Sequence, residues 1–257
     1  MLMIKQIKRF LFLVLGLPNY LKLLHFTFVK LYQSQLLKGN ENYKFNYFVK
    51  HLIQKGDVVI DIGANLGYFS SIFAKLTGTS GKVICIEPVK PFFETLQWGL
   101  KKYPNCTIYN YALGTEKKSV ELVLPKLDGV FRTGLPHIPS DESEKKDSYI
   151  FETQMVIGSE LLINLSKIDY IKCDIEGYEE YVIPEIRCIF NKFRPILQIE
   201  TWGTHKPVVM KLMKELDYNA YTLHKDRLVF DEKGELHEGD ILFVPTEKLN
   251  KISHLTQ

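Results

Sequence analysis

The sequence predicts an α/β protein with a doubly wound, mainly parallel sheet that follows an N-terminal helical extension. Segments with strand and helix patterns alternate through most of the chain, and this order is typical of right-handed crossovers. Several strand segments also place apolar residues at consecutive positions instead of alternating them with polar residues. Strands that are buried on both faces of a parallel sheet have this composition. These segments are 58–62, 82–86, 168–173 and 195–199.

The helices between these strands are predicted from apolar residues at helical spacing and from residues that begin or end helices. They cover 43–55, 66–76, 91–102, 178–190 and 206–216. Pro91 suits the first turn of its helix, whereas Pro184 interrupts another. Further strands are predicted at 106–111, 120–124, 151–157, 218–223 and 240–244, the second of them in a hairpin.

The first 42 residues differ from the domain predicted for 43–257. Residues 1–40 hold six basic side chains and no acidic one. The apolar run near residue 11 ends at Pro18, short of the ~20 residues that span a bilayer. Three interpretations are therefore open: a helix at a membrane interface, with contact through residues 1–38, a helix packed on the domain, or a signal sequence.

Composition narrows the class of protein. The 257 residues suffice for one domain with a sizeable core, and the net charge of +3 does not indicate a nucleic-acid partner. The cysteines form no C-x-x-C pair, which argues against a zinc or redox motif. We expect them to be reduced core or near-core residues, as suits a cytoplasmic protein. A position at the inner face of the membrane is the alternative that the N-terminal segment leaves open. They are Cys85, Cys106, Cys173 and Cys188.

Residues 125–150 form a predicted loop insertion rich in proline, glycine and charge. Loops of this length in compact domains usually have a function or lack order. We expect this one to fold over a bound acceptor. On that hypothesis Arg132 contacts an acidic or phosphate-bearing group, and His137 is a second candidate for substrate contact.

The first strand ends in a glycine-containing loop, DIGANLG, at residues 61–67. Glycine lets backbone approach a ligand, and the N-terminus of the next helix favours an anion. The anion is either a dinucleotide pyrophosphate or an amino-acid carboxylate. The loop lacks the G-x-G-x-x-G spacing of dinucleotide sites, and Asp61 would repel a pyrophosphate but favour an ammonium group. Glu87, which ends the second strand, is placed to accept hydrogen bonds from ribose hydroxyls.

The motifs VVIDIGANLGYF, VICIEP, YNYALG, IDYIKCDIEGYE and PILQIE together resemble the FkbM family of S-adenosylmethionine-dependent methyltransferases. The resemblance covers roughly residues 45–203 and implies a Rossmann-like class I methyltransferase fold. It also implies S-adenosylmethionine as cofactor and a hydroxyl acceptor on a glycan or secondary metabolite. The residues then expected at the cofactor are Asp61, Gly63, Ala64, Asn65, Gly67, Tyr68, Glu87, Pro88, Tyr111, Ala112 and Asp174.

Two departures from the family pattern put the acceptor in doubt. The usual T-L-D-x-L segment is replaced by GSELL at 158–162, and Pro184-Glu185-Ile186 stands where a glycine-alanine pair is common. Both changes concern packing near the site more than the cofactor itself.

Transfer of a methyl group to an alcohol requires alignment of the two reactants and a base for the hydroxyl proton. Asp174 is the first candidate base, followed by Glu176 and His205. Asp174, Glu176 and Glu200 are also oxygen ligands that suit a divalent cation such as Mg²⁺, so that a metal requirement stays open. Glu179 is interpreted as an acid that favours the N-terminus of its helix.

We expect an O-methyltransferase that acts on a glycan, a lipid-linked saccharide or a secondary metabolite. The alternatives are an NAD-dependent oxidoreductase, a methyltransferase for nucleic acid or protein, and a non-catalytic binding protein with the same fold. The loop spacing argues against the first. The Asn/Asp-Pro-Pro-Tyr/Phe amine motif of the second is absent from the sequence.

Overall fold

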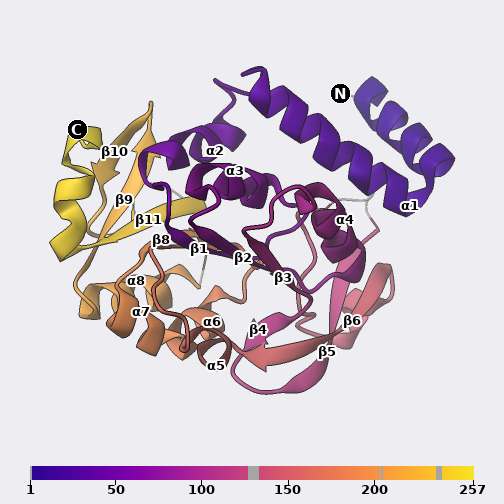
Figure 1. Ribbon diagram of the computed structural model, residues 1–257. Helices are drawn as coiled ribbons and strands as arrows, with labels where there is room; N and C mark the ends of the chain where they lie inside the picture. Colours follow the sequence, from indigo (N-terminus) through magenta and orange to yellow (C-terminus); the bar gives the residue numbers. More distant parts are fainter. Residues whose placement is uncertain (1, 127–132, 202, 204, 236–238) are drawn as a thin grey trace.

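In the computed structural model, a central sheet of eight strands separates two layers of helices (Figure 1). The structure describes residues 2–126, 133–201, 203, 205–235 and 239–257. The strand order is β10-β9-β11-β8-β7-β1-β2-β3. The bounds are β1 Val58–Ile62, β2 Lys82–Ile86, β3 Cys106–Tyr109, β7 Tyr170–Cys173, β8 Ile196–Thr201, β9 Tyr218–His224, β10 Arg227–Phe230 and β11 Gly239–Pro245.

The five strands from β3 to β8 are parallel, and β11 joins them antiparallel to β8 and β9. The predicted mainly parallel sheet is therefore confirmed. β10 pairs with β9 as an antiparallel edge strand that the sequence patterns did not predict. The chain ends in two short 3₁₀ helices, η4 Thr246–Lys251 and η5 Ser253–Leu255.

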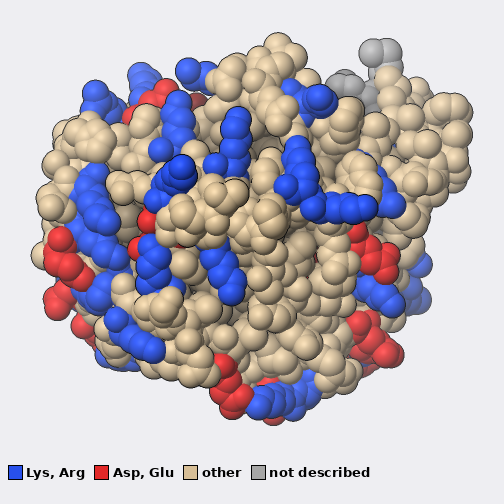
Figure 2. Space-filling model, in the orientation of Figure 1, with Lys and Arg blue, Asp and Glu red and all other residues tan. Residues whose placement is uncertain are grey.

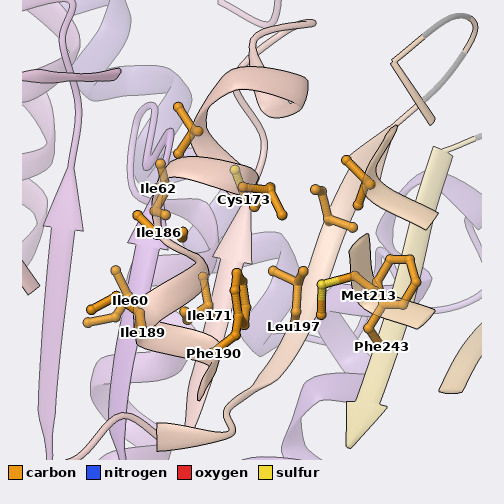
Figure 3. Packing of buried hydrophobic residues seen from close by; sticks show 14 of the residues in the cluster. Ile60, Ile62, Ile171, Cys173, Ile186, Ile189, Phe190, Leu197, Met213 and Phe243 are labelled. Carbon is orange, nitrogen blue, oxygen red and sulfur yellow. The ribbon is translucent and has the colours of Figure 1, made fainter. Parts of the chain in front are cut away.

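Helices cover both faces of the sheet, which explains why apolar residues occupy consecutive positions in its strands. Val59 packs in the cluster on the face of α2 and α3, whereas Ile60 and Ile62 pack with α6 and α7. Figure 3 shows Ile60, Ile62 and Cys173 beside Ile186 and neighbouring helix residues. The helices are α2 Lys44–Phe48, α3 Tyr68–Thr77 and α4 Lys90–Leu100 on one face, and α5 Gly158–Leu162, α6 Glu179–Glu185, α7 Arg187–Phe193 and α8 Lys206–Glu215 on the other.

Two predicted helices are divided in the structure, and one predicted strand is shorter than expected. The helix at 43–55 is η1 Glu41–Tyr43, α2 and η2 Val49–His51. The helix at 178–190 breaks into α6 and α7 after Pro184, which lacks the N–H of a helix interior. The strand at 106–111 ends at Tyr109 because Asn110 turns its side chain to the carbonyls of Glu87 and Pro88, at 2.8 and 2.9 Å.

A second sheet, in the order β4-β6-β5, lies beside the main one. Its strands are β4 Ala112–Gly114, β5 Lys118–Pro125 and β6 Ser148–Ile157, and β5 and β6 form the predicted antiparallel pair. β5 and β6 extend into the predicted insertion from its two ends. The segment that connects them is therefore 126–147, and it includes the short helix η3 Glu142–Lys145.

The N-terminal helix, α1 Leu2–Gln33, consists of two segments that meet at Gly16, where the backbone leaves the helical region (φ 67°, ψ 165°). Figure 1 shows the segments folding back on each other. The second segment packs on the domain through the buried side chains of Tyr20, Leu21, His25 and Phe28. This contact matches the interpretation of a packed helix for that segment.

The first segment of α1 exposes large apolar side chains instead. Phe10 is 64% exposed and Leu13 is 70% exposed. By length and composition alone, Gln6–Gln33 would be long and apolar enough to cross a membrane. The break at Gly16 divides this range, so the expectation that the apolar run ending at Pro18 is too short to span a bilayer stays a prediction.

All four cysteines are free. Cys85 and Cys173 are buried in strands, and Cys106 is half-buried, as expected. The expectation was wrong for Cys188, which is exposed. It lies on α7, whose other face supplies the buried Ile189 and Phe190.

Candidate active site

The glycine loop follows β1 at the carboxyl edge of the sheet. Its backbone takes positive φ at Gly63 (74°), Asn65 (51°) and Gly67 (84°). A Cβ on Gly63 would lie 1.8 Å from the carbonyl oxygen of Asp174, so that only glycine fits where the ends of β1 and β7 meet. The loop is tied to the insertion, because the side chain of Asn65 donates to the carbonyl of Thr133 at 2.7 Å.

Glu87 is buried next to this loop. Its Oε2 accepts a hydrogen bond from the backbone N–H of Asn65 at 2.7 Å, and its Oε1 accepts one from Val89 at 2.8 Å. Burial raises the pKa of Glu87 to about 8, although both hydrogen bonds act in the opposite direction. The carboxyl group is thus held in one orientation at the end of β2.

Asp61 lies behind the loop, fully buried, and is absent from the walls of the cavities described below. Ser70 on α3 donates to its Oδ2 at 2.5 Å. Its Oδ1 is buried and has no hydrogen-bond partner among the described residues. Burial raises the pKa of this carboxyl. A contact between Asp61 and a cofactor, directly or through water, stays a prediction.

A cavity of about 660 Å³ opens in front of Glu87. Its wall is mostly apolar, with Glu87, Asp174 and Glu176 as the acidic groups. The insertion contributes Pro136 and Ile138. The predicted cofactor residues that line it are Gly63, Asn65, Glu87, Pro88, Tyr111, Ala112 and Asp174.

The other three predicted cofactor residues support the loop from behind. Ala64 is buried in the cluster under α3, and Gly67 is the N-cap of that helix. Tyr68 stacks on Phe28 of α1 with ring centroids 4.2 Å apart. The second segment of α1 therefore packs directly behind the predicted cofactor loop.

His25 strengthens this contact between α1 and the loop. Its Nδ1 lies 2.6 Å from the carbonyl oxygen of Leu66, which makes Nδ1 the protonated nitrogen. A Cβ on Gly99 would come within 2.4 Å of the imidazole, so that glycine there leaves room for the ring. Burial lowers the pKa of His25 and favours the neutral form.

The D-x-E-G-x-E segment turns sharply after β7. Glu176 and Gly177 both have positive φ, 54° and 97°. Glu179 holds this turn, since its carboxylate accepts hydrogen bonds from the N–H groups of Ile175 at 2.8 Å and Gly177 at 2.9 Å. Glu179 is thus a structural residue at the start of α6. Burial and the carboxylates of Asp174 and Glu179 raise the pKa of Glu176 to about 7.

Lys172, which the sequence analysis did not single out, lies at the centre of the acidic groups. Its side chain is 4% exposed, and its Nζ lies 2.9 Å from Asp174 Oδ2 and 5.0 Å from the ring centroid of Phe69. Burial acts to lower the pKa of Lys172, but the carboxylates of Asp174 and Asp61 outweigh it and raise that pKa. Lys172 therefore stays charged and fixes one oxygen of Asp174. A lysine in an otherwise apolar strand, two residues before the candidate base, was the available signal.

A second cavity, of about 1030 Å³, lies on the other side of Asp174. Its wall is polar and combines η1 with the ends of β7, β8, β9 and β11. Glu200 lines it and makes a side-chain hydrogen bond with Asp174, and burial together with the Asp174 carboxylate raises the pKa of Glu200 to about 8. The lining residues are Glu41, Asn42, Lys44, Phe69, Lys172, Asp174, Glu200, Thr222, Leu223, Gly239 and Asp240.

The remaining predicted site residues lie outside both cavity walls. His205 Nδ1 lies 2.7 Å from Glu180, and Nε2 lies near Gly177. His137 bridges to Glu144 at 2.6 Å and to the carbonyl of Leu135 at 2.9 Å. Arg132 lies outside the described residues. A catalytic role for His205 and substrate contacts of His137 and Arg132 stay predictions.

Asp174, Glu176 and Glu200 were also considered as cation ligands. Across the described ranges, no group of three or more His, Cys, Asp or Glu side chains is arranged to hold a metal ion. The Oδ2 of Asp174 instead contacts the Lys172 ammonium.

The first cavity fits S-adenosylmethionine. Its apolar wall suits an adenine ring, Glu87 offers carboxylate oxygens to ribose hydroxyls, and the glycine loop leaves room for the amino-acid end. This cavity lies at the carboxyl edge of a mainly parallel sheet in which the antiparallel strand β11 lies between β8 and β9. Fold and site together match the class I methyltransferase fold.

Comparison with known proteins places the chain within that class. The family model for the methyltransferase FkbM domain matches residues 61–220, more than half of the sequence. The chain belongs to the FkbM methyltransferase family.

One solved structure from this family is similar in fold. The FkbM methyltransferase from Methylobacillus flagellatus is similar over 78% of this chain, with a TM-score of 0.52 and 18% identity. The present chain spans 47% of that protein's length. An S-adenosylmethionine-dependent O-methyltransferase from Thermotoga maritima gives a TM-score of 0.43 at 14% identity, covering 79% of this chain and 64% of the other. A fibrillarin from Aeropyrum pernix in complex with S-adenosylmethionine gives 0.43 at 10%, covering 75% and 68%.

Proposed function

We propose that this protein is an S-adenosylmethionine-dependent O-methyltransferase that acts on a hydroxyl group of a glycan, a lipid-linked saccharide or a secondary metabolite. The observation that carries the proposal is the position of Asp174, the residue that lines both cavities. A base at this position can reach an acceptor hydroxyl on one side while the methyl donor lies on the other.

The cofactor supplies a methyl group activated by a positively charged sulfur. Gly63 and Asn65 hold the loop at its amino-acid end, and Glu87 holds its ribose. The apolar side chains of Val89 and Phe92 exclude water from the adenine region. Each of these functions follows from the wall of the first cavity.

Asp174 then takes the proton of the acceptor hydroxyl. The deprotonated oxygen could then attack the methyl group that a bound cofactor would supply, with the neutral thioether as the leaving group. Lys172 keeps Asp174 oriented through its 2.9 Å contact and offers N–H donors to the oxygen as it becomes more negative. A positioned base typically contributes ~10²–10⁴-fold to the rate.

The cofactor assignment is tested by calorimetric titration with S-adenosylhomocysteine and, separately, with NAD⁺. We expect micromolar binding of S-adenosylhomocysteine and no measurable heat from NAD⁺. The opposite result would identify the oxidoreductase alternative and end the proposal. A radiolabelled methyl group appearing in an alkali-stable ether product would then establish O-methylation.

We also propose that the first segment of α1 contacts the cytoplasmic face of a membrane. Its exposed apolar side chains include Ile7, Phe10, Leu13 and Val14, and Lys8 and Arg9 lie beside them. Figure 2 shows a lobe at the upper right, where α1 folds back, whose surface is largely uncharged. An apolar surface beside basic residues suits a bilayer that contains anionic lipids.

Sedimentation with phosphatidylglycerol vesicles tests this contact. We expect the protein to sediment with these vesicles, and Leu13→Asp to reduce the bound fraction at least about fivefold. Val208→Asp serves as the control, since Val208 is an exposed apolar residue on α8. Equal binding of both variants would show that the first segment is not the membrane contact.

A further inference from the structure

We infer that the second cavity binds the methyl acceptor, and that it selects a polyhydroxylated group without acidic substituents. The inference rests on the proposed function and deepens it, because it assigns a place and a chemical class to the acceptor. It also differs from the hypothesis that Arg132 in the insertion contacts an acidic substrate. Pro136 and Ile138, two described residues of the insertion, line the cofactor cavity instead.

The charges in the second cavity favour a group that is not negative. Four carboxyl side chains line the wall, and two lysines accompany them. Both lysines have an acidic neighbour: Lys172 contacts Asp174 at 2.9 Å, and Lys44 lies 3.7 Å from Glu41. The acidic groups beyond these pairs are Glu200 and Asp240. A further carboxylate or phosphate placed here would meet the Asp240 carboxylate in a partly buried setting and, above about pH 8, the ionised Glu200 as well, which is unfavourable.

The hydrogen-bonding groups match hydroxyls, which donate and accept at once. Asp240 is held in place by Gln198, whose side-chain nitrogen donates to its Oδ1 at 2.8 Å. Gln198 is in turn fixed by the Tyr170 hydroxyl, which donates to its Oε1 at 2.7 Å. A fixed acceptor such as Asp240 binds a hydroxyl without having to be ordered first.

Lys172 supplies the complementary donor. Its ammonium group has three N–H bonds, and within the described part of the chain Asp174 is its hydrogen-bond acceptor. The nitrogen is buried yet lies in the cavity wall, so that its other N–H groups can reach an oxygen bound there. A hydroxyl between Lys172 and Asp174 would accept from the first and donate to the second. That arrangement is the one required for transfer of its proton to Asp174.

The chain segments around the cavity connect it to the N-terminal helix. η1, which contributes Glu41, follows α1 after a short link, and Lys44 begins α2. An acceptor bound here would therefore lie beside the C-terminal end of α1. The second segment of α1 separates that end from the first segment, which we propose to contact the membrane.

Saturation-transfer NMR on protein saturated with S-adenosylhomocysteine tests the inference. The probes are methyl α-D-glucopyranoside and methyl α-D-glucopyranosiduronate, which differ in one carboxylate. We expect the neutral glycoside to bind with millimolar affinity and the uronate at least about tenfold more weakly. Binding of the uronate as tightly as the glycoside, or of neither probe, would overturn the inference.

Two matched variants locate the binding. Asp240→Asn removes a charge from the cavity wall, and we expect it to reduce the discrimination between the probes at least about threefold. Glu94→Gln removes a charge from the exposed face of α4, outside both cavity walls, and should leave the discrimination unchanged. Unaltered discrimination in Asp240→Asn would place the glycoside elsewhere. If the unmodified protein does not bind S-adenosylhomocysteine, the proposed function itself is contradicted. Failure of the acceptor inference and failure of the proposed function therefore give different results.

Discussion

The two cavities meet at Asp174, but their walls differ in polarity and in the elements that form them. The cofactor cavity has a mostly apolar wall made by the glycine loop, the end of β2 and the second sheet. The second cavity has a charged wall made by η1 and by strands on the antiparallel side of the sheet. The difference separates two tasks: the first wall holds a ligand with a large apolar ring, and the second holds groups that exchange hydrogen bonds and a proton.

The largest expected effect comes from Gly63, which lines the first cavity and packs against the backbone of Asp174. In Gly63→Ala the new methyl group would meet the carbonyl of Asp174, and we expect the free energy of unfolding to fall by at least ~3 kcal/mol. Chemical denaturation measures this loss. Gly39→Ala is the control, because Gly39 also has positive φ but open space around it, and should cost ~1–2 kcal/mol. Equal losses would show that β1 and β7 do not approach as closely as described.

Asp174→Asn tests the shared side chain itself. The amide keeps the shape of the carboxylate but cannot take a proton, so we expect kcat to fall ~10²–10⁴-fold. Calorimetry should show the affinity for S-adenosylhomocysteine within about threefold of the unmodified protein, because the first cavity has other contacts to the cofactor. A kcat within a few-fold of normal would remove Asp174 as the base and direct attention to Glu176.

The sequence predicted the cofactor cavity far better than the second one. DIGANLG and Glu87 lie directly after strands, so their positions follow from the order of elements and from the edge at which parallel strands end. Seven of the eleven predicted cofactor residues line the cavity, namely Gly63, Asn65, Glu87, Pro88, Tyr111, Ala112 and Asp174. The others support the loop from behind. They were predicted at the cofactor because they lie next to the motif in sequence, but sequence proximity does not reveal which side chains point outward.

The second cavity could not be derived in the same way. Its wall includes Glu41 and Asp240, which are distant in sequence. The antiparallel pairing of β11 with β8 brings Asp240 to this wall, and no sequence motif predicts that pairing. The division of α1 at Gly16 was missed for a related reason, since apolar periodicity reports burial and not whether a helix folds back. Lys172 was overlooked because a charged residue inside a buried strand conflicts with the pattern used to find that strand.

Glu87 and Glu200 allow the two cavities to be compared directly. Both are carboxyl groups with a pKa raised to about 8, mainly by burial, but each lines a different cavity. At pH 9, where Glu87 is mostly ionised, Glu87→Gln should weaken S-adenosylhomocysteine binding ~10–100-fold, because hydrogen bonds to a charged group contribute ~1.5–3 kcal/mol. Glu200→Gln should change that affinity less than about threefold. If calorimetry shows equal effects, the two cavities are not separate binding sites.

The smallest expected effect is a pH dependence of stability that arises at the second cavity. The pKa of Glu200 is about 8 in the folded protein and near its ordinary value of 4.5 in the unfolded chain. The folded state therefore holds this proton more tightly, and the resulting stability is fully present below about pH 4.5 and is lost as the pH rises through 8. Glutamine cannot ionise, so Glu200→Gln should show a smaller fall in Tm between pH 6 and pH 9.

The expected difference is ~2–4 °C, which corresponds to ~1 kcal/mol for a domain of this size, and differential scanning fluorimetry resolves it. Glu144→Gln is the control of opposite sign, since hydrogen bonds from Ser140 and His137 lower the pKa of Glu144 to about 2. Its stability contribution is lost as the pH falls below 4.5 and stays constant between pH 6 and pH 9. A steeper fall in Glu200→Gln than in the unmodified protein would mean that Glu200 is ionised in the folded state, and that Lys172 outweighs the acidic groups around it.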